Sequence, residues 1–240
     1  MSNKICITGA SRGIGQAIAA AFAREGWELY LICKENLKAM EEAAEVWRQA
    51  YGTDAACFAI DVADAAAYEA FLKELPAMDV LINNAGISFV GLLQDMELSD
   101  WRRVMDTNLT SVFLSCKYLL PGMLSRGGGR IINISSVWGE HGASMESAYS
   151  ASKGAVNALT KALAKETATT NVQINAIACG LIDTSMNAHL SEKEIQSLIG
   201  EIPANRIGRP EEVAALCLQL ASAPEYLTGQ IITLDGGWTV

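Results

Sequence analysis

The sequence is poor in the residues that build metal sites and disulfide scaffolds. Two histidines occur in 240 residues, His141 and His189, and they lack the spacing of metal ligands. The six cysteines form no Cys-x-x-Cys pair, and most of them lie in apolar runs. We therefore expect no zinc site, and we expect small buried thiols in a reducing compartment.

Long apolar runs and basic clusters are missing as well. No apolar stretch approaches the roughly 18 residues of a membrane-spanning helix, and a strand is expected already at Ile5, which leaves no signal-peptide pattern before it. The formal net charge is −9 without a Lys/Arg cluster, which argues against nucleic-acid binding and weakly against an acidic protein partner. We expect a cytoplasmic protein that binds neither membranes nor nucleic acids.

What the chain does contain is an alternation of short apolar runs with longer amphipathic stretches, which is typical of βαβ crossovers. It predicts an α/β fold in which a single domain, residues 1–240, forms a Rossmann-type, doubly wound, parallel seven-stranded sheet with helices on both faces. Half of the residues are hydrophobic, enough for a large core. The expected strands are residues 5–8, 28–33, 55–60, 79–82, 130–134, 172–177 and 230–234, and the expected helices are 13–25, 36–51, 64–74, 99–123, 148–168 and 210–221.

Two further features of this pattern concern its boundaries. Ser99 is expected to cap the helix 99–123, which is expected to end near Pro121 and Gly122. Residues 180–209 show no regular pattern, and an irregular segment of that length in a compact domain is usually functional. We therefore predict a substrate lid at about residues 180–209.

A glycine-rich segment directly follows the first strand. Gly9, Gly13 and Gly15 have the spacing G-x-x-x-G-x-G, with Ser11 and Ile14 between them. Glycines allow a sharp turn and a close approach of the backbone to a pyrophosphate, and the helix that begins there directs free N–H groups at the phosphates. An ordinary glycine turn is the alternative, but the position after the first strand of a βαβ unit favours a dinucleotide site.

The end of the second strand indicates which dinucleotide binds. NAD sites usually place an acid there to hold the ribose 2′-OH, whereas this strand is followed by Lys34, and Arg12 lies in the glycine loop. Lys34 and Arg12 together could hold a 2′-phosphate, which favours NADP(H). Glu35 is the opposing signal, because its carboxylate could meet a ribose hydroxyl instead.

Further crevice residues are expected after the third and fourth strands. Asp61 and Val62 suit the adenine edge, with the alternative that Asp61 caps the next helix, a role for which Asp64 is better placed. Small and amide-bearing residues after the fourth strand are expected at the ligand crevice, where parallel strands end. These residues are Asn83, Ala85 and Gly86.

Tyr149, Lys153 and Ser136 carry the expected chemistry. Tyr149 and Lys153 are four residues apart, on one face of a helix. An ammonium about 4 Å from the phenol contributes on the order of 4 kcal/mol at an effective dielectric constant near 20, which predicts a phenol pKa up to roughly three units below ~10. The phenol would then exchange a proton near neutral pH. Such a pair also arises by chance as a surface contact, but Ser136, at the end of the fifth strand, can hydrogen-bond a carbonyl oxygen.

Together these residues resemble the short-chain dehydrogenase/reductase family over the whole chain. The resemblance is carried by Thr8-Gly9-x-x-x-Gly13-Ile14-Gly15, Asn83-Asn84-Ala85-Gly86, Asn108, Ser136, Tyr149-x-x-x-Lys153 and Asp235-Gly236-Gly237. It implies that Tyr149 protonates a carbonyl oxygen, that Lys153 binds the nicotinamide ribose and that Ser136 orients the substrate. It further implies that Asn108 holds a water in a proton relay. Contacts to the nicotinamide and diphosphate are implied for Gly180, Ile182 and Thr184.

The family also implies an assembly and reveals one departure. Its members are usually tetramers, so a homotetramer is implied, with the helices 99–123 and 148–168 at one interface and the last strand at a second. Cys179 stands where the family usually has proline, which frees one backbone angle in the loop over the nicotinamide. Cys179 is interpreted either as a redox handle or, more in keeping with its apolar setting, as a buried inert thiol.

Within the family the chain looks most like the 3-oxoacyl-(acyl-carrier-protein) reductases of fatty acid biosynthesis, so we expect an NADPH-dependent ketone reductase. Acyl carrier protein is acidic, however, and the loop before the fifth strand offers only Arg126 and Arg130 as bases. Residues 135–146 are similar to a bacterial subgroup that reduces a 5-aminopentanone group on elongation factor P. Glu140 and Glu146 would suit such a cationic amino-ketone, or they are merely solvated. A non-catalytic NADP(H)-binding relative is the third interpretation.

Overall fold

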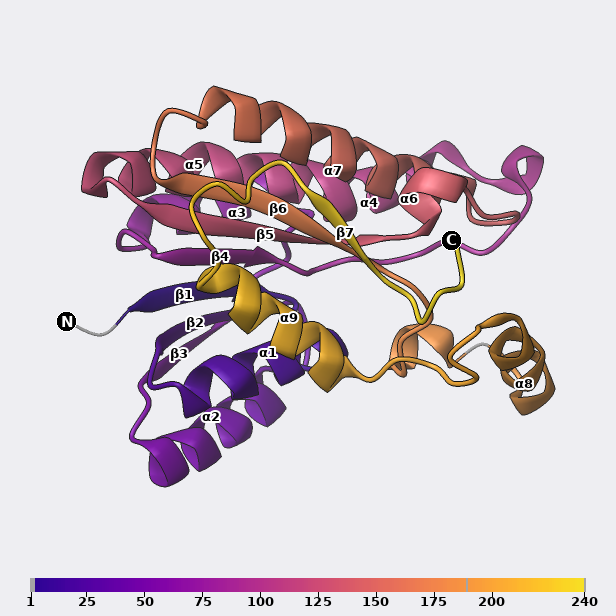
Figure 1. Cartoon of the computed structure of the whole chain (residues 1–240), viewed down its shortest axis with the longest axis horizontal. Coiled ribbons are helices and arrows are strands. Elements are labelled where there is room, and N and C mark those ends of the chain that lie inside the picture. Colours follow the sequence, from indigo (N-terminus) through magenta and orange to yellow (C-terminus); the bar gives the residue numbers. More distant parts are fainter. Residues whose placement is uncertain (1–2, 189, 240) are drawn as a thin grey trace.

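The computed structural model describes residues 3–188 and 190–239, so that His189 lies outside the described residues. Within these residues, seven parallel strands form one sheet in the order β3-β2-β1-β4-β5-β6-β7, which confirms the predicted fold (Figure 1). The order reverses between β1 and β4, the switch point at which doubly wound sheets bind their ligands. The strands are β1 (Lys4–Thr8), β2 (Glu28–Cys33), β3 (Ala55–Ala59), β4 (Val80–Asn83), β5 (Gly129–Ser136), β6 (Val172–Cys179) and β7 (Ile231–Leu234).

Helices cover both faces of the sheet (Figure 1). On one face lie α1 (Gly13–Arg24), α2 (Leu37–Tyr51) and α9 (Pro210–Ala221), and on the other lie α3 (Ala65–Glu74), α4 (Leu98–Met105), α5 (Ser111–Arg126) and α7 (Ser147–Glu166). The two faces of the sheet carry separate hydrophobic cores. Ile5 and Ile7 of β1 belong to one core and Cys6 to the other, so the strand is apolar on both sides. Within the described residues, no helix combines the length and apolar character that crossing a membrane requires.

The helix expected at 99–123 is present as one continuous helical segment, residues 98–126, but its bounds and its interior differ from the prediction. The structure has α4, a π-helical turn (Asp106–Thr110) and α5, which runs on to Arg126. Ser99 is not the cap, because α4 begins at Leu98. Pro121 lies inside α5, and the helix ends instead at Gly127, whose φ of 75° closes a left-handed cap. The predicted end is wrong because a proline is tolerated within a helix when tertiary packing supports the turn around it.

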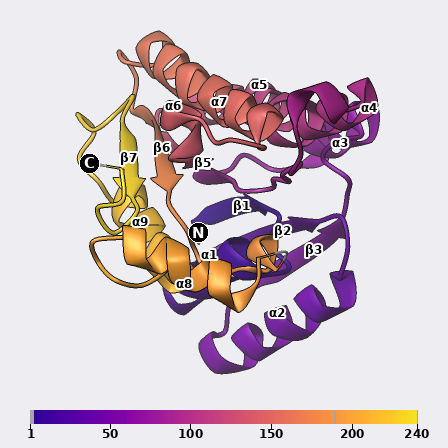
Figure 2. The same cartoon turned by 90° about the vertical axis from the view of Figure 1, so that its right-hand side faces the viewer.

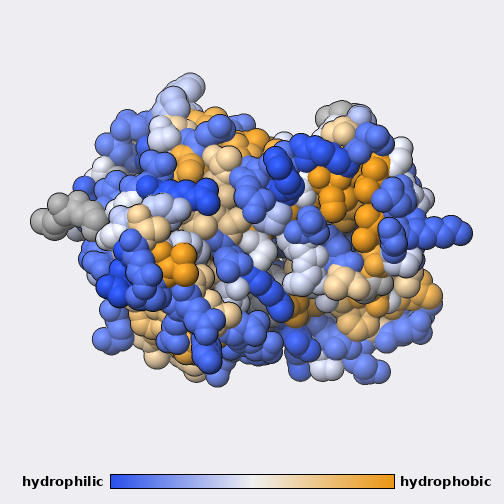
Figure 3. Space-filling model, turned by 90° about the horizontal axis from the view of Figure 1, so that it is seen from below, coloured by the Kyte–Doolittle hydropathy of each residue, from blue (hydrophilic) through white to orange (hydrophobic). Residues whose placement is uncertain are grey.

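The expected irregular segment 180–209 is only partly irregular. It contains a short 3₁₀ turn (Ser185–Asn187) and α8 (Glu192–Glu201), which starts with a capping box between Ser191 and Glu194. No residue of α8 is buried. Figure 2 looks onto the end of the molecule where α6 (Trp138–His141) and α7 lie above and α8 lies below. Hydrophobic residues also gather on this end of the lower face in Figure 3.

Candidate active site

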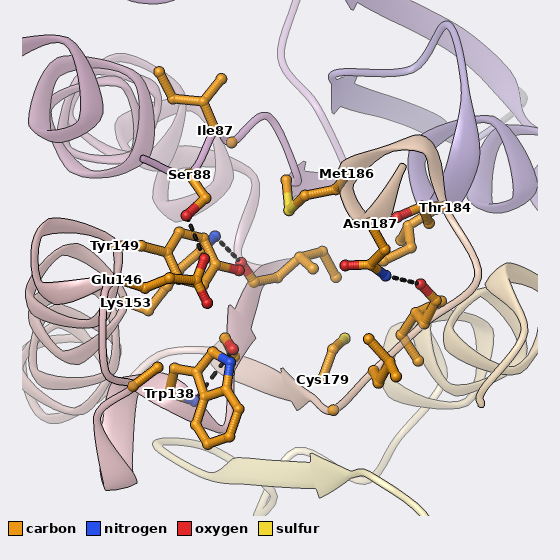
Figure 4. Close-up of a pocket in the computed structure, with 18 of the residues that line it drawn as sticks. Ile87, Ser88, Trp138, Glu146, Tyr149, Lys153, Cys179, Thr184, Met186 and Asn187 are labelled. Atoms are coloured by element: carbon orange, nitrogen blue, oxygen red, sulfur yellow. Dashed lines mark hydrogen bonds between the residues drawn. The ribbon is translucent and has the colours of Figure 1, made fainter. Parts of the chain in front are cut away.

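A cavity of about 720 Å³ opens at the edge where β1, β4, β5 and β6 end (Figure 4). Most of the residues expected to form the site line it. These are Gly9, Arg12, Gly13, Ile14, Ala85, Gly86, Ser136, Tyr149, Lys153, Gly180, Ile182 and Thr184. The remaining expected residues do not line it: Ser11, Gly15, Lys34, Asp61, Val62, Asn83 and Asn108.

The glycine loop packs tightly against itself and against β4. A Cβ atom on Gly15 would lie 2.1 Å from the carbonyl oxygen of Gly9, so only glycine fits there. Gly9 has a φ of 67°, a conformation that favours glycine. The side-chain amide of Asn84 donates to the backbone carbonyl oxygens of Thr8 (2.9 Å) and Gly9 (3.1 Å). The loop is therefore fixed, with Gly13, the first residue of α1, on the cavity wall.

The structure separates the two asparagines that follow one another at the end of β4, although the sequence placed this segment at the crevice. The Asn83 side chain is buried in the core, where it donates to the Asn133 side chain (2.8 Å) and accepts from Ser115 (2.6 Å). Its side chain therefore does not reach the cavity, contrary to expectation. Asn84 lines the cavity instead. Neighbouring residues of a strand point to opposite faces, so one position decides which amide reaches the ligand side.

The residues expected around the adenosine end form an ion pair. Lys34 Nζ lies 2.8 Å from Asp61 Oδ2, and both side chains are about half exposed. Burial by itself raises the pKa of Asp61, but the bonds from Lys34 and the Ala63 N–H lower it overall. Asp64 caps α3 by accepting from the Ala67 N–H (3.0 Å), which leaves Asp61 free for the pair.

Tyr149, Lys153 and Ser136 all line the cavity, and Figure 4 shows Tyr149 and Lys153 side by side on one wall of it. The Lys153 ammonium is buried, donates to the Ile134 carbonyl oxygen (2.8 Å) and lies 5.6 Å from the centre of the Tyr149 ring. Ser136 is buried as well, and its Oγ accepts from the backbone N–H of Trp138 (3.2 Å). The pairing expected from the four-residue spacing is therefore present.

The expected direction of the Tyr149 pKa is wrong for the chain by itself. Burial raises the pKa of the phenol above its ordinary range, and a hydrogen bond with Ser136 offsets only part of that rise. Burial likewise lowers the pKa of Lys153 to about 8. The prediction counted the charge of the ammonium but not the loss of water around both groups, and the loss of water dominates.

Asn108 lies behind the catalytic pair, in the π-helical turn. Its side chain accepts from the Ile87 N–H (2.9 Å) and donates to the Ile87 carbonyl (2.9 Å) and to Ser152 Oγ (3.0 Å). A Cβ atom on Gly86 would lie 3.5 Å from both Asn108 Oδ1 and Lys153 Nζ. Asn108 and Lys153 therefore converge on the same small residue. π-helical turns of this kind are frequent at functional sites.

The rest of the cavity is formed by one candidate acid from the sequence, Glu146, and by side chains that the sequence did not assign. Ser88 donates to the carboxylate of Glu146, and this pair faces Trp138 across the opening (Figure 4). Asn187 donates to the Ile182 carbonyl oxygen (2.7 Å), which ties the 3₁₀ turn to the loop after β6. Glu140, the other candidate acid, is exposed and does not line the cavity.

Cys179 lies at the end of β6, and its thiol is buried against the cavity. Burial raises the pKa of this thiol to about 12, and the nearby Lys153 ammonium lowers it by less. The thiolate is therefore scarce near neutral pH, which favours the interpretation as an inert thiol. The described part of the chain contains no cluster of three or more His, Cys, Asp or Glu residues that could hold a metal ion.

These features fit a nicotinamide dinucleotide. The glycine loop offers a close backbone approach, the first turn of α1 lines the cavity, and the half-buried Tyr149 and the buried Lys153 line it as well. The fold and site together define a nicotinamide-dependent oxidoreductase. Residues 3–195 match the family model for short chain dehydrogenases. The chain belongs to this short-chain dehydrogenase/reductase family.

Comparisons with known proteins agree with this assignment. The chain is 36% identical to the oxidoreductase YmfI of Bacillus subtilis (strain 168), with 99% of each chain covered. It is 38% identical to the 3-oxoacyl-[acyl-carrier-protein] reductase FabG of Thermotoga maritima, with 100% of this chain and 99% of the relative covered. The structure of L-sorbose reductase from Gluconobacter frateurii, complexed with NADPH and L-sorbose, has a TM-score of 0.91 and 28% identity, with 99% of this chain and 97% of that chain covered.

Proposed function

We propose that the protein is an NADPH-dependent ketone reductase and that its substrate is a 3-oxoacyl thioester, as used in fatty acid biosynthesis. The observation that carries the proposal is that Ser136, Tyr149 and the buried Lys153 line the same cavity as the glycine loop, with the Lys153 ammonium 5.6 Å from the centre of the Tyr149 ring. The 3-oxoacyl reductase among the relatives, similar over the full length of the chain, supports the thioester.

The side chains divide the work of the reduction. When bound, the cofactor supplies a hydride to the carbonyl carbon. Ser136 donates a hydrogen bond to the carbonyl oxygen, and the Tyr149 phenol donates its proton to that oxygen, so that the ketone becomes an alcohol. The raised pKa of Tyr149 keeps the phenol protonated at neutral pH, which suits a proton donor. Lys153 holds the ribose hydroxyls of the cofactor, and Asn108 supports a water that returns the proton.

Different residues in and around the cavity are assigned to different parts of the cofactor. The glycine loop at Gly9, Ser11, Gly13, Ile14 and Gly15 would hold the pyrophosphate, and Arg12 and Lys34 would hold the 2′-phosphate of NADPH. Asp61 and Val62 would contact the adenine. Ala85, Gly86, Gly180, Ile182 and Thr184 would contact the nicotinamide. The Arg12 side chain at the cavity wall supports NADPH over NADH, because NADH offers no phosphate for it to neutralise.

A second substrate class is favoured by one observation, the Glu146 carboxylate on the cavity wall beside Ser88. Among the described residues that line the cavity, Glu146 is the one with an acidic side chain. The basic residues of the lining, Arg12 and Lys153, are assigned to the cofactor and are therefore not available to the substrate. A carboxylate at the mouth stabilises a substrate that carries an ammonium group. The alternative substrate is therefore a cationic amino-ketone, such as the 5-aminopentanone group on elongation factor P.

The assembly we propose is a homotetramer. Large apolar side chains on the outer surface of α4 and α5 support it, because Leu98 is 59% exposed and Phe113 is 49% exposed. Burying such side chains against a second copy removes apolar area from water. The helices α5 and α7 would form one interface, and β7 would lie at another.

The two substrate classes are distinguished by NADPH oxidation with an acetoacetyl thioester and with an unbranched amino-ketone. Reduction of the thioester, with Glu146→Gln changing its kcat/KM less than about threefold, supports the first class. Reduction of the amino-ketone supports the second class if Glu146→Gln lowers its kcat/KM about tenfold or more. The exposed control Glu140→Gln should leave that kcat/KM unchanged. NADPH binding without reduction of any ketone would overturn both and favour a non-catalytic dinucleotide-binding protein.

A further inference from the structure

The C-terminal turn, residues 235–239, is built to a defined shape. The Asp235 carboxylate accepts hydrogen bonds from the Gly237 N–H (2.9 Å), from the Thr239 N–H (2.8 Å) and from the Thr239 hydroxyl (2.8 Å). Gly236 and Gly237 both have positive φ, which such a tight turn requires. The Gly236 carbonyl also accepts from the Ala204 N–H (3.0 Å). The turn is therefore fastened both to itself and to the segment before α9.

This turn places Trp238 in the active-site cavity. Trp238 and Trp138 both line the cavity, and their rings meet edge to face with centres 5.0 Å apart. Trp138 begins α6, directly after β5, whereas Trp238 follows β7, so the contact joins distant parts of the sequence. Edge-to-face packing is a favoured arrangement of aromatic rings. The two indoles therefore form one continuous, rigid apolar wall.

The apolar wall lines the same cavity as Ser136 and Tyr149, the residues assigned to the reaction. The backbone N–H of Trp138 donates to Ser136 Oγ (3.2 Å), so the start of α6, which carries the indole, is anchored beside the hydroxyl that meets the carbonyl. In Figure 4 the ring of Trp138 extends along the cavity below Tyr149 and Glu146. A substrate whose ketone contacts Ser136 and Tyr149 must extend the rest of its chain past this wall or away from it.

We propose that Trp238 is a specificity-determining residue, which together with Trp138 forms the wall against which the substrate chain beyond the ketone packs. The inference rests on the proposed reductase function and names its substrate shape: an unbranched chain that lies flat on two aromatic rings. A branched chain of equal carbon number collides with the rigid wall. The C-terminal turn is thereby part of the active site.

The test uses Trp238→Ala and Trp238→Phe in the full-length protein, with Trp27→Phe as the matched control. Trp27 packs edge to face on Phe22 (5.1 Å between ring centres), and it does not line the cavity. Unbranched and branched ketones of equal carbon number are compared by kcat/KM with NADPH. In parallel, the same ketones are titrated into protein saturated with NADP⁺, and tryptophan fluorescence is recorded, which requires no turnover.

We expect Trp238→Ala to lower the ratio of kcat/KM for unbranched over branched ketones by about tenfold or more, the scale of small steric differences in a pocket. Trp238→Phe is intermediate, the NADPH Kd stays within about twofold, and Trp27→Phe changes neither quantity. Equal losses for both ketone shapes would show a merely structural role and overturn the inference. If the wild-type protein reduces no ketone, the proposed function fails; the fluorescence titration then decides on the wall, because an equal ketone Kd in the wild type and in Trp238→Ala contradicts it.

Discussion

The two halves of the cavity are built in different ways. The coenzyme half consists largely of backbone: Gly9 and Gly13, with Gly15 packed against Gly9 in support, small residues after β4, and the first turn of α1. The substrate half consists of side chains from separate segments, namely Ser88, Trp138, Glu146, Met186 and Trp238. A backbone cradle tolerates almost no change, whereas a wall of side chains is altered one residue at a time. The first half therefore fixes the reaction class, and the second half sets the substrate.

Gly15→Ala is the strongest test of the backbone half. The added Cβ would lie 2.1 Å from the Gly9 carbonyl oxygen, a backbone atom that cannot move without opening the loop. We expect a loss of at least about 3 kcal/mol in the free energy of unfolding, together with loss of NADPH binding. Urea unfolding and NADPH fluorescence measure the two effects.

Gly200→Ala, outside the cavity lining, is the control for that variant. An added Cβ meets no atom within 4 Å there, and Gly200 lies inside α8. Replacing glycine in a helix should stabilise the protein by roughly 0.5–1 kcal/mol. If both alanine variants were equally stable, the claim that the backbone half tolerates almost no change would not hold.

The pH dependence of Lys153 gives the next largest effect. Burial lowers the pKa of Lys153 from 10.5 to about 8, and at about 1.36 kcal/mol per pKa unit this corresponds to roughly 3 kcal/mol. Below pH 8 the ammonium is charged in both states, and the folded state carries the full cost of burial. Between about pH 8 and 10.5 the unfolded state binds more protons, so the free energy of unfolding rises with pH.

Lys153→Met should therefore be most favourable to stability below pH 8, relative to the wild type, and should lose that advantage toward pH 10.5. Denaturant unfolding of both proteins across this range measures the difference, and the lost bond to Ile134 shifts both ends of the range equally. A difference that stays constant with pH would show that the burial cost has been misassigned.

Lys34→Ala has the smallest expected effect. The pair with Asp61 is about half exposed, so its removal should change the free energy of unfolding by less than about 1 kcal/mol. The NADPH Kd should nevertheless rise by about tenfold while the NADH Kd is unchanged, because Lys34 is assigned to the 2′-phosphate. Lys38→Ala is the control, since Lys38 is an exposed lysine on α2 in a similar pair with Glu42. Equal changes for both coenzymes would remove Lys34 from the phosphate site.

The sequence predicts the coenzyme half well because its signals are local. Glycine spacing after a strand, and Tyr149 four residues before Lys153, follow from the geometry of single elements. The parallel seven-stranded sheet also follows from the βαβ alternation, and the structure confirms it. By contrast, the choice between Asn83 and Asn84 depends on which face of the sheet each side chain takes, and both faces of this sheet are covered.

The substrate half escaped prediction because its parts meet only in three dimensions. Trp238 contacts Trp138 through the C-terminal turn, and no spacing in the sequence encodes that contact. The pKa of Tyr149 failed for a related reason: the charge of Lys153 can be read from the helix, but the burial of both groups depends on the complete fold. The π-helical turn at Asn108 likewise interrupts a segment whose pattern is helical throughout.

The most direct test of the account is turnover by Tyr149→Phe, measured beside NADPH binding to the same variant. The phenylalanine ring keeps the packing of the tyrosine and removes only the hydroxyl that donates the proton. The account predicts that kcat for ketone reduction falls at least about a hundredfold, with the NADPH Kd within about twofold of the wild-type value. Turnover near the wild-type level would contradict the assignment of Tyr149 as the proton donor, and with it the reductase mechanism.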